Sequence, residues 1–335
     1  MTELNILLTC VGGEQSPALI NQVYKISKKE HLNVKIIGID NDNNAIGKYF
    51  VDNFIVSPLG NAKTYISFIK KIIKKYNINL IIPRSDEEAL TLSKSKPQIE
   101  KLNAIITTST FKNINIFSNK ILTYRELNKI GLGPKSWDYA NNKNELINKV
   151  KLRFLKSNKC IIKPAIARGG KNIFLISNNK NKKANEISLN NFLDKKKIKY
   201  PYVIMSELNN PILDVDFLCK DGQLINYIAR ERKDPLKPNN GNRIVKNNYY
   251  KTIAKKIANH FNLTWIFDLD IMYDNAEEPV IIEINPRMSG SFSSGVALNP
   301  SILINIFRIY RNHNLLIKDK FIKKETTPYS DLLII

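Results

Sequence analysis

The chain has 335 residues, of which 43% are hydrophobic and 24% charged, and its formal net charge is +22. A chain of this length is expected to form more than one hydrophobic core, so we expect two or three domains. No run of about 18 consecutive apolar residues occurs, which argues against a membrane-spanning helix. The three scattered cysteines argue against a disulfide framework and a cysteine metal site, and they favour a reducing cytoplasm.

The positive charge has two interpretations. A polyanionic partner would explain it, but so would a composition rich in Lys, Asn and Ile throughout the chain. The lysines of residues 69–75 lie at solvent-type helix positions and do not alternate with aromatic residues, which favours solvated faces. We therefore expect no nucleic-acid partner and no membrane partner, although the charge would attract an anionic nucleotide or substrate.

The first third of the chain alternates short apolar runs with helical periodicity. The beginning of the chain carries an acidic Glu3 and no basic region, so we expect a strand there and no signal peptide. Strands are predicted at residues 4–10, 34–40, 54–57, 80–83 and 105–107, with helices from Ser16, over 62–76 and over 85–93. Strands that alternate with helices predict an α/β domain with a parallel, doubly wound sheet.

The pattern changes near residue 115. A helix is predicted over 120–130, then strands at 160–163 and 172–176, a polar surface helix or loop over 177–199, and an antiparallel set at 203–206, 215–219 and 224–231. A mobile segment over 233–248 is followed by a helix over 249–261, strands at 265–273 and 280–285, a helix over 301–311 and a last strand over 332–335.

The strands 265–273 and 280–285 flank a segment with the composition of a hairpin loop. Pairing their ends next to the loop places four oxygen-bearing side chains on one face: Asp268, Asp270, Glu283 and Asn285. Acids gathered inside an apolar hairpin would repel one another, and a divalent cation such as Mg²⁺ relieves that repulsion. A slip of one residue would separate the set, and a solvent-exposed acidic face is the alternative.

Basic and glycine residues near these strands suit phosphate binding. Lys163 ends an apolar strand, where a phosphate would give it a partner, although its ammonium could also reach solvent. Gly169 and Gly170 could bring backbone N–H groups close to a phosphate, but the Walker A spacing is absent and a plain turn fits equally well. Arg287 suits bidentate contact with phosphate or carboxylate, with a structural salt bridge as the alternative.

Other chemistries find little support in the sequence. The three histidines (His31, His260 and His313) are isolated, which argues against a catalytic triad or a zinc site. Gly12 and Gly13 lack the dinucleotide-binding glycine spacing, although a glycine turn before a helix could still bind an anion.

Taken in order, these pieces resemble the ATP-grasp superfamily over nearly the whole chain, most closely its carbamoyl-phosphate-synthase-like, carboxylate–amine ligase branch. Residues 6–13 and 82–88 resemble the N-terminal pre-grasp domain, and the Glu-Ile-Asn-Pro-Arg run at 283–287 is the most specific motif. The resemblance implies a Rossmann-like domain over 1–114, a small grasp lobe with a glycine-rich lid over 115–206, and a C-terminal lobe with the metal site over 207–335.

The resemblance also implies roles for individual residues. Lys120 and Lys163 would hold ATP phosphates, and the lid would comprise Arg168, Gly169, Gly170 and Lys171. The adenine hinge would comprise Ser206, Glu207 and Leu208, and the metal ligands Asp270, Glu283 and Asn285. The family's ribose-binding glutamate is absent here, and Asp214 is the candidate to replace it. Family members often carry Gln or Glu where Asp270 stands, so the metal geometry could differ.

The activity implied is ATP-dependent ligation, in which a carboxylate becomes an acyl phosphate and an amine then displaces phosphate. Arg287, Lys163 and Arg230 would be the catalytic residues, with ATP and two Mg²⁺ ions as cofactors and Mn²⁺ as a substitute. The expected partners are small, anionic carboxylate and amine substrates, and a homodimer is compatible with the sequence. Side chains expected to line the substrate pocket are Arg84, Ser85, Arg232, Arg243, Ser289 and Ser291.

Three alternatives remain open at this point. Carboxyphosphate or carbamoyl-phosphate chemistry on bicarbonate would use the same fold. A non-catalytic ATP-binding sensor subunit would keep the fold without the reaction. A nucleic-acid-binding protein would show affinity that falls steeply with salt and does not depend on Asp270.

Overall fold

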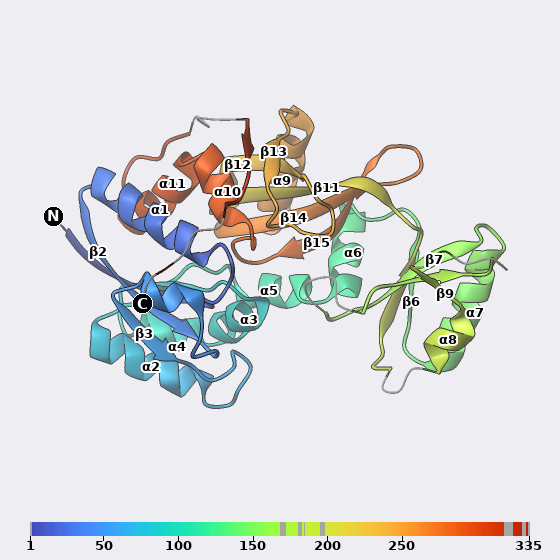
Figure 1. Cartoon of the computed structure of the whole chain (residues 1–335), viewed down its shortest axis with the longest axis horizontal. Coiled ribbons are helices and arrows are strands. Elements are labelled where there is room, and N and C mark those ends of the chain that lie inside the picture. The colour runs from blue at the N-terminus through green and yellow to red at the C-terminus, as the bar shows by residue number, and fades with distance from the viewer. Residues whose placement is uncertain are drawn as a thin grey trace. The chain divides into compact units, whose positions relative to one another are not determined.

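The computed structural model describes residues 2–167, 172–179, 183, 185–194, 198–317, 324–329 and 333. The chain divides into two compact units (Figure 1). Unit 1 comprises Met1–Asn115, Pro211–Asp270 and Ile284–Ile335, and unit 2 comprises Ile116–Asn210 and Ile271–Glu283. Within the described ranges, no helix is both long enough and apolar enough to cross a membrane.

Unit 1 begins with a five-stranded sheet in the order β3-β2-β1-β4-β5. Its strands are β1 (Thr2–Thr9), β2 (Leu32–Asp40), β3 (Asn53–Val56), β4 (Leu80–Ile82) and β5 (Ile105–Ile106). Every pairing is parallel. Strand β4 in the interior of the sheet is buried throughout, as expected for a parallel sheet covered on both faces, whereas the edge strand β3 is partly exposed. The predicted doubly wound parallel sheet is confirmed.

The helices of this part are α1 (Ser16–Lys29), α2 (Tyr65–Tyr76), α3 (Asp86–Lys94), α4 (Lys96–Glu100) and α5 (Phe111–Phe117), with the 3₁₀ turn η1 at Ile46–Tyr49. Helix α2 buries Ile69 and Ile73 and exposes Lys71 and Lys74, so its lysines form a solvated face, as the sequence indicated. Helix α3 is capped by Ser85, whose hydroxyl accepts from the Glu88 backbone N–H and donates to the Glu88 carboxylate.

The second sheet has six strands in the order β15-β14-β11-β12-β13-β16. They are β11 (Asn209–Lys220), β12 (Gln223–Arg232), β13 (Asn242–Ile244), β14 (Trp265–Tyr273), β15 (Pro279–Asn285) and β16 (Glu325–Thr326), and α9 (Asn248–His260) connects β13 to β14. Strand β13 lies inside 233–248, where the sequence analysis expected a mobile segment and did not predict a strand. The reason is that β13 is fixed by antiparallel pairing with β12 and β16, which local composition does not reveal.

The two sheets of unit 1 share a core with the C-terminal helices α10 (Phe292–Leu298) and α11 (Ser301–Tyr310). Leu19 and Val23 of α1 belong to the same buried cluster as Phe292 and Ile302. Figure 1 shows α1 beside α10 and α11, and the contacts between these helices agree. The segment that follows β15 is therefore anchored to the N-terminal part of the chain.

Unit 2 is built on a five-stranded sheet in the order β6-β10-β7-β8-β9. Its strands are β6 (Trp137–Ala140), β7 (Lys159–Pro164), β8 (Phe174–Ser177), β9 (Glu186–Ile187) and β10 (Tyr202–Met205), and its helices are α6 (Lys120–Lys129), α7 (Lys143–Phe154) and α8 (Leu189–Leu193). The core of the sheet packs Leu146 and Val150 of α7 against Ile162 and Ile176. The strand predicted at 332–335 lies outside the described residues apart from Leu333.

Candidate nucleotide and metal site

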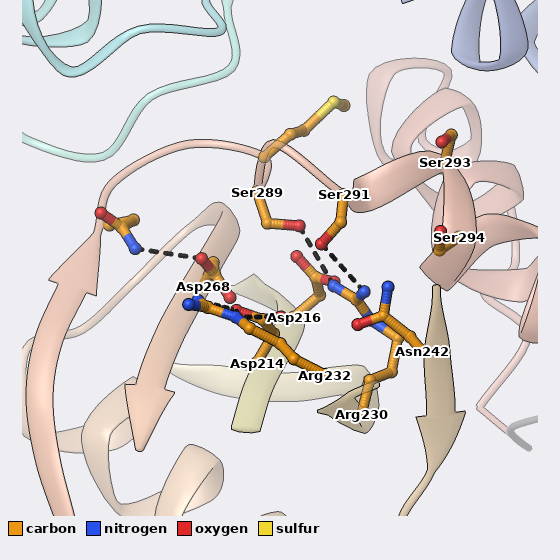
Figure 2. Close-up of polar contacts among 12 residues, drawn as sticks. Asp214, Asp216, Arg230, Arg232, Asn242, Asp268, Ser289, Ser291, Ser293 and Ser294 are labelled. Carbon is orange, nitrogen blue, oxygen red and sulfur yellow. Dashed lines mark hydrogen bonds and ion pairs between the residues drawn. The ribbon is translucent and has the colours of Figure 1, made fainter. Parts of the chain in front are cut away.

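Three aspartates converge on one face of the second sheet in unit 1. Asp214 comes from β11, and Asp268 and Asp270 come from β14. Each offers a carboxylate oxygen within 4.8 Å of the others. The side-chain amide of Asn285, at the end of β15, donates to Asp268 at 3.0 Å and lies 3.5 Å from Asp270. The predicted sharing of one face by Asp268, Asp270 and Asn285 is therefore confirmed. We call Asp214, Asp268 and Asp270 the acidic cluster, and Figure 2 labels two of its members, Asp214 and Asp268.

In the acidic cluster, Asp214 and Asp268 are buried and Asp270 is partly exposed. Phe267, Leu269 and Ile271 point to the opposite face of β14 and are almost completely buried. Burial, followed by the neighbouring carboxylates Asp216, Asp270 and Asp214, raises the pKa of Asp268 well above its usual value, and Arg287 only partly offsets this. The cluster therefore favours any positively charged group that reaches it.

Arg232 of β12 is the positive charge that the structure places there. Its Nε lies 3.0 and 3.1 Å from the two carboxylate oxygens of Asp214, and its Nη2 lies 3.2 Å from Asp270. Burial alone would lower the pKa of Arg232, but Asp214 and Asp270 raise it above its usual value. The ribose contact predicted for Asp214 has no counterpart in these contacts, because Asp214 is buried in the acidic cluster and bound by Arg232.

Arg230, two residues earlier on β12, is completely buried. It forms an ion pair with Asp216 and donates to the hydroxyls of Ser291 at 3.0 Å and Ser289 at 3.2 Å (Figure 2). These contacts fix the loop that follows β15. Arg230 has no exposed surface in this structure. The predicted contact of Arg230 with a substrate anion would therefore require the side chains that cover it to move.

Arg287 lies next to the predicted metal ligand Asn285. Its Nη2 donates to Asn285 Oδ1 at 3.3 Å, and its Nε lies 3.0 Å from Asp86. The salt bridge that the sequence left open as the alternative for Arg287 is therefore present, and contact of Arg287 with a phosphate or substrate carboxylate stays a prediction. Nearby, Arg84 donates to Ser16 Oγ at 2.6 Å and to the Cys10 carbonyl at 3.2 Å, and burial together with Arg287 lowers its pKa.

Unit 2 gathers the two predicted phosphate lysines. Lys120, at the start of α6, has its Nζ 3.1 Å from Glu283 and 3.0 Å from the Ala167 carbonyl. The Nζ of Lys163 lies 5.5 Å from the centre of the Tyr124 ring, a cation–π distance. Tyr124 donates its hydroxyl to the Ile282 carbonyl at 2.8 Å. Glu283, predicted as a metal ligand, is thus held by a predicted phosphate lysine.

The remaining residues predicted for the site either lie outside the described residues or make few contacts in the structure. The lid residues Arg168, Gly169, Gly170 and Lys171 lie outside the described residues. Ser206, Glu207 and Leu208 follow the end of β10, where the Ser206 backbone N–H donates to Ser136 at 3.4 Å and Glu207 is exposed. Arg243 is exposed, with its Nε 3.7 Å from Glu325.

Sequence reasoning missed Tyr124 and the pairing of Arg232 with the acidic cluster. Tyr124 lies four residues after Lys120, which places both on one face of α6, so helical spacing could have identified it. Arg232 was expected only to line a substrate pocket. Its proximity to Asp214 follows from the β11–β12 pairing, in which Asp214 lies opposite Arg230 and Leu213 opposite Glu231.

Comparison with known proteins agrees with this architecture. A family model described as ATP-grasp in the biosynthetic pathway with Ter operon matches residues 199–313, and a PylC-like N-terminal domain model matches residues 6–107. An uncharacterized protein of Methanocaldococcus jannaschii is 26% identical over 191 residues, which are 55% of this chain and 44% of that protein. The match therefore spans less than half the length of that relative.

Solved structures of similar fold cover most of the chain. N5-carboxyaminoimidazole synthetase from Staphylococcus aureus with ADP has a TM-score of 0.73 at 12% identity, covering 96% of this chain and 81% of that chain. The biotin carboxylase domain of 2-oxoglutarate carboxylase from Hydrogenobacter thermophilus, with MgADP and bicarbonate, has a TM-score of 0.71 at 13% identity, covering 92% and 70%. L-amino acid ligase from Bacillus licheniformis has a TM-score of 0.60 at 13% identity, covering 89% and 70%.

Identities this low establish the fold alone. The two family models add the sequence pattern at both ends of that fold, and the residue order read from the sequence agrees with them. The chain thus matches a PylC-like N-terminal domain model over residues 6–107 and an ATP-grasp model over residues 199–313, and its fold is that of the ATP-grasp structures.

Proposed function

We propose that this chain is an ATP-dependent ligase that activates a small carboxylate as an acyl phosphate and couples it to an amine. The observation that carries the proposal is the contact between Lys120 and Glu283, at 3.1 Å. These residues were assigned to phosphate and to metal from separate motifs, and the fold brings them together. The ADP in the Staphylococcus aureus enzyme and the name of the Bacillus licheniformis ligase support the same class.

The residues fit a nucleotide and a hard cation. Lys120 and Lys163 would bind phosphate oxygens, because each is a mostly buried ammonium to which a polyphosphate offers charge-assisted hydrogen bonds. The proposed ligands Asp270, Glu283 and Asn285 would all offer oxygen atoms, which suits Mg²⁺ and also Mn²⁺. When bound, magnesium would neutralise charge on the phosphates during phosphoryl transfer.

The reaction needs no nucleophilic side chain. The substrate carboxylate attacks the γ-phosphorus, the bond to the bridging oxygen breaks, and ADP leaves. The amine then attacks the acyl carbon, phosphate leaves and the amine loses a proton. Burial raises the pKa of the Cys10 and Cys160 thiols to about 12, so neither offers a thiolate near neutral pH.

Within this proposal, the substrate anion would contact Arg287. Arg287 is half-buried beside Asn285, so one anion could reach it from the metal side. Arg230 would act by holding Ser289 and Ser291, and so the loop that follows Arg287 in sequence. We further propose that the substrates are small and anionic, that the nucleotide adenine contacts the 206–208 segment, and that the protein acts in the cytoplasm.

Activation of bicarbonate is a second candidate. The Hydrogenobacter thermophilus domain of the same fold was solved with MgADP and bicarbonate, which favours this candidate over other single-carbon substrates. The two candidates differ in what stimulates ATP cleavage. If the protein activates bicarbonate, bicarbonate alone stimulates cleavage in the absence of any other carboxylate.

The test is phosphate release from Mg-ATP by the purified protein with pooled carboxylates and amines in bicarbonate-free buffer. We expect one pool to stimulate release and Glu283→Ala to abolish the stimulation. Glu126→Ala is the matched control, because Glu126 lies in unit 2 and pairs with the exposed Lys129. Stimulation by bicarbonate alone would select the second candidate, and a protein that binds no ATP would contradict both.

A further inference from the structure

The acidic cluster and the adjacent Asp216 bring four carboxylates together beside the guanidinium groups of Arg230 and Arg232, and Arg287 also acts on Asp268. Arg232 binds Asp214 and Asp270, and Arg230 binds the adjacent Asp216. Asp268 is only 2% exposed, and its Oδ1 has no hydrogen-bond partner within the described part of the chain. Its other oxygen accepts only the neutral amide of Asn285. A buried carboxylate oxygen without a partner is costly, so it calls for a ligand.

Arg232 shows what kind of ligand the acidic cluster prefers. Its guanidinium bridges Asp214 and Asp270, in the position of a positive charge between two carboxylates. Arg232 and Asp270 keep 13% and 18% of their side chains exposed, so this corner of the cluster is open to solvent. A small cation could therefore enter where the guanidinium lies, and there it would also be near Asp268.

We propose that unit 1 binds a divalent cation on Asp214, Asp268 and Asp270 without any nucleotide, and that Arg232 competes with it for the same carboxylates. Three carboxylates are hard oxygen ligands, which suit Mg²⁺ or Mn²⁺. The site shares Asp270 with the metal set of the proposed ligase but adds Asp214 and Asp268. All three ligands belong to unit 1, so binding requires neither Glu283 nor the lysines of unit 2.

This inference goes beyond the proposed reaction and does not depend on it. A proton shared among the carboxylates would be the other way to relieve their repulsion. The two explanations differ in one respect, since a shared proton would compete with a metal ion and lower its apparent affinity for the cluster.

The test measures Mn²⁺ binding to the full chain by electron paramagnetic resonance in the absence of nucleotide. We expect one site in the wild type, and we expect Asp214→Asn and Asp268→Asn each to weaken it by about tenfold or more, as loss of a ligand does. Glu283→Gln should leave this binding unchanged. Asp221→Asn is the matched control, because Asp221 is an exposed aspartate on the turn between β11 and β12.

Arg232→Gln gives the opposite expected result. Removing the competing positive charge should tighten Mn²⁺ binding by roughly tenfold or more. No Mn²⁺ binding by the wild type would overturn the proposal, as would binding that Asp214→Asn and Asp268→Asn leave intact. If both aspartate variants fail to fold, an unchanged affinity in Arg232→Gln overturns it instead. Failure of ATP cleavage while Mn²⁺ still binds would contradict only the ligase.

Discussion

The two units treat their buried charges differently. Unit 1 binds the guanidinium groups of Arg230 and Arg232 to carboxylates of the same sheet, and Arg230 with Asp216 is the extreme case because neither is exposed. Unit 2 keeps Lys163 against the face of the Tyr124 ring and Lys120 against Glu283 and one carbonyl.

The difference indicates which charges serve the fold and which are available to a ligand. A completely buried ion pair is locked, since breaking it leaves a charge in a medium that cannot solvate it. A lysine that lies over a ring or shares a partly exposed carboxylate can exchange that contact for a phosphate at little cost. We therefore expect substitutions in unit 1 to change stability first, and substitutions in unit 2 to change nucleotide binding first.

The largest expected effect is on the Arg230–Asp216 pair. Arg230→Met should lower the free energy of unfolding by about 3–5 kcal/mol, because Asp216 would remain buried without its counter-ion. Urea unfolding measures this. The double variant Arg230→Met with Asp216→Leu is the control and should recover most of the loss. If Arg230→Met keeps its stability and loses only activity, Arg230 serves the substrate and the comparison fails for unit 1.

Lys163→Met should lower the affinity for ATP and leave the stability of the protein nearly unchanged. We expect little change in unfolding free energy, because a methionine fills the same space beside Tyr124. ATP affinity should fall by about 10- to 100-fold, the value of a charge-assisted hydrogen bond of about 1.5–3 kcal/mol. Isothermal titration with ATP and Mg²⁺ measures it. Lys149→Met is the control, since Lys149 also lies beside an aromatic ring in unit 2, that of Tyr139. Equal losses in the two variants would mean that net charge alone binds the nucleotide.

Tyr124→Phe should have a smaller effect that separates packing from ligand binding within unit 2. The change keeps the ring under Lys163 and removes the hydroxyl that donates to Ile282. We expect a loss of about 1 kcal/mol in unfolding free energy, the usual value of one hydrogen bond. ATP affinity should stay within about twofold of the wild type. A large fall in affinity would show that the 2.8 Å bond from Tyr124 to Ile282 positions Glu283, the next residue.

Local features of the site could be predicted from the sequence. Asp268 and Asn285 were expected on one face because both belong to a single hairpin with period-2 alternation, and their hydrogen bond confirms it. Helix α7 could also have been found, since Asn142 caps it and Glu145 stands three residues later, although the sequence analysis passed over it.

Features that depend on distant pairing could not be predicted. The Lys120–Glu283 contact joins a helix start to a strand far along the chain, and no periodicity in either segment specifies the other. Arg232 meets Asp214 only because β11 and β12 pair in one register, and a different register would separate them. The sequence around strand β13 is rich in glycine and asparagine and does not favour a strand. The extended conformation of β13 comes from its antiparallel pairing with β12 and β16.

The smallest effect on unfolding free energy is expected at the helix cap Ser85, and it shows how much an ordinary substitution in unit 1 costs. Ser85 caps α3 by accepting from the Glu88 backbone N–H and also donates to the Glu88 carboxylate, and the loss of such a cap in Ser85→Ala should cost about 1 kcal/mol in unfolding free energy. Ser85→Thr keeps the hydroxyl and should recover most of that loss, and thermal unfolding of both variants measures it. If Ser85→Ala costs as much as Arg230→Met, then unit 1 is marginally stable everywhere. The loss of unfolding free energy in Arg230→Met would then reflect the low stability of unit 1 as a whole. It would not be specific to the buried Arg230–Asp216 ion pair.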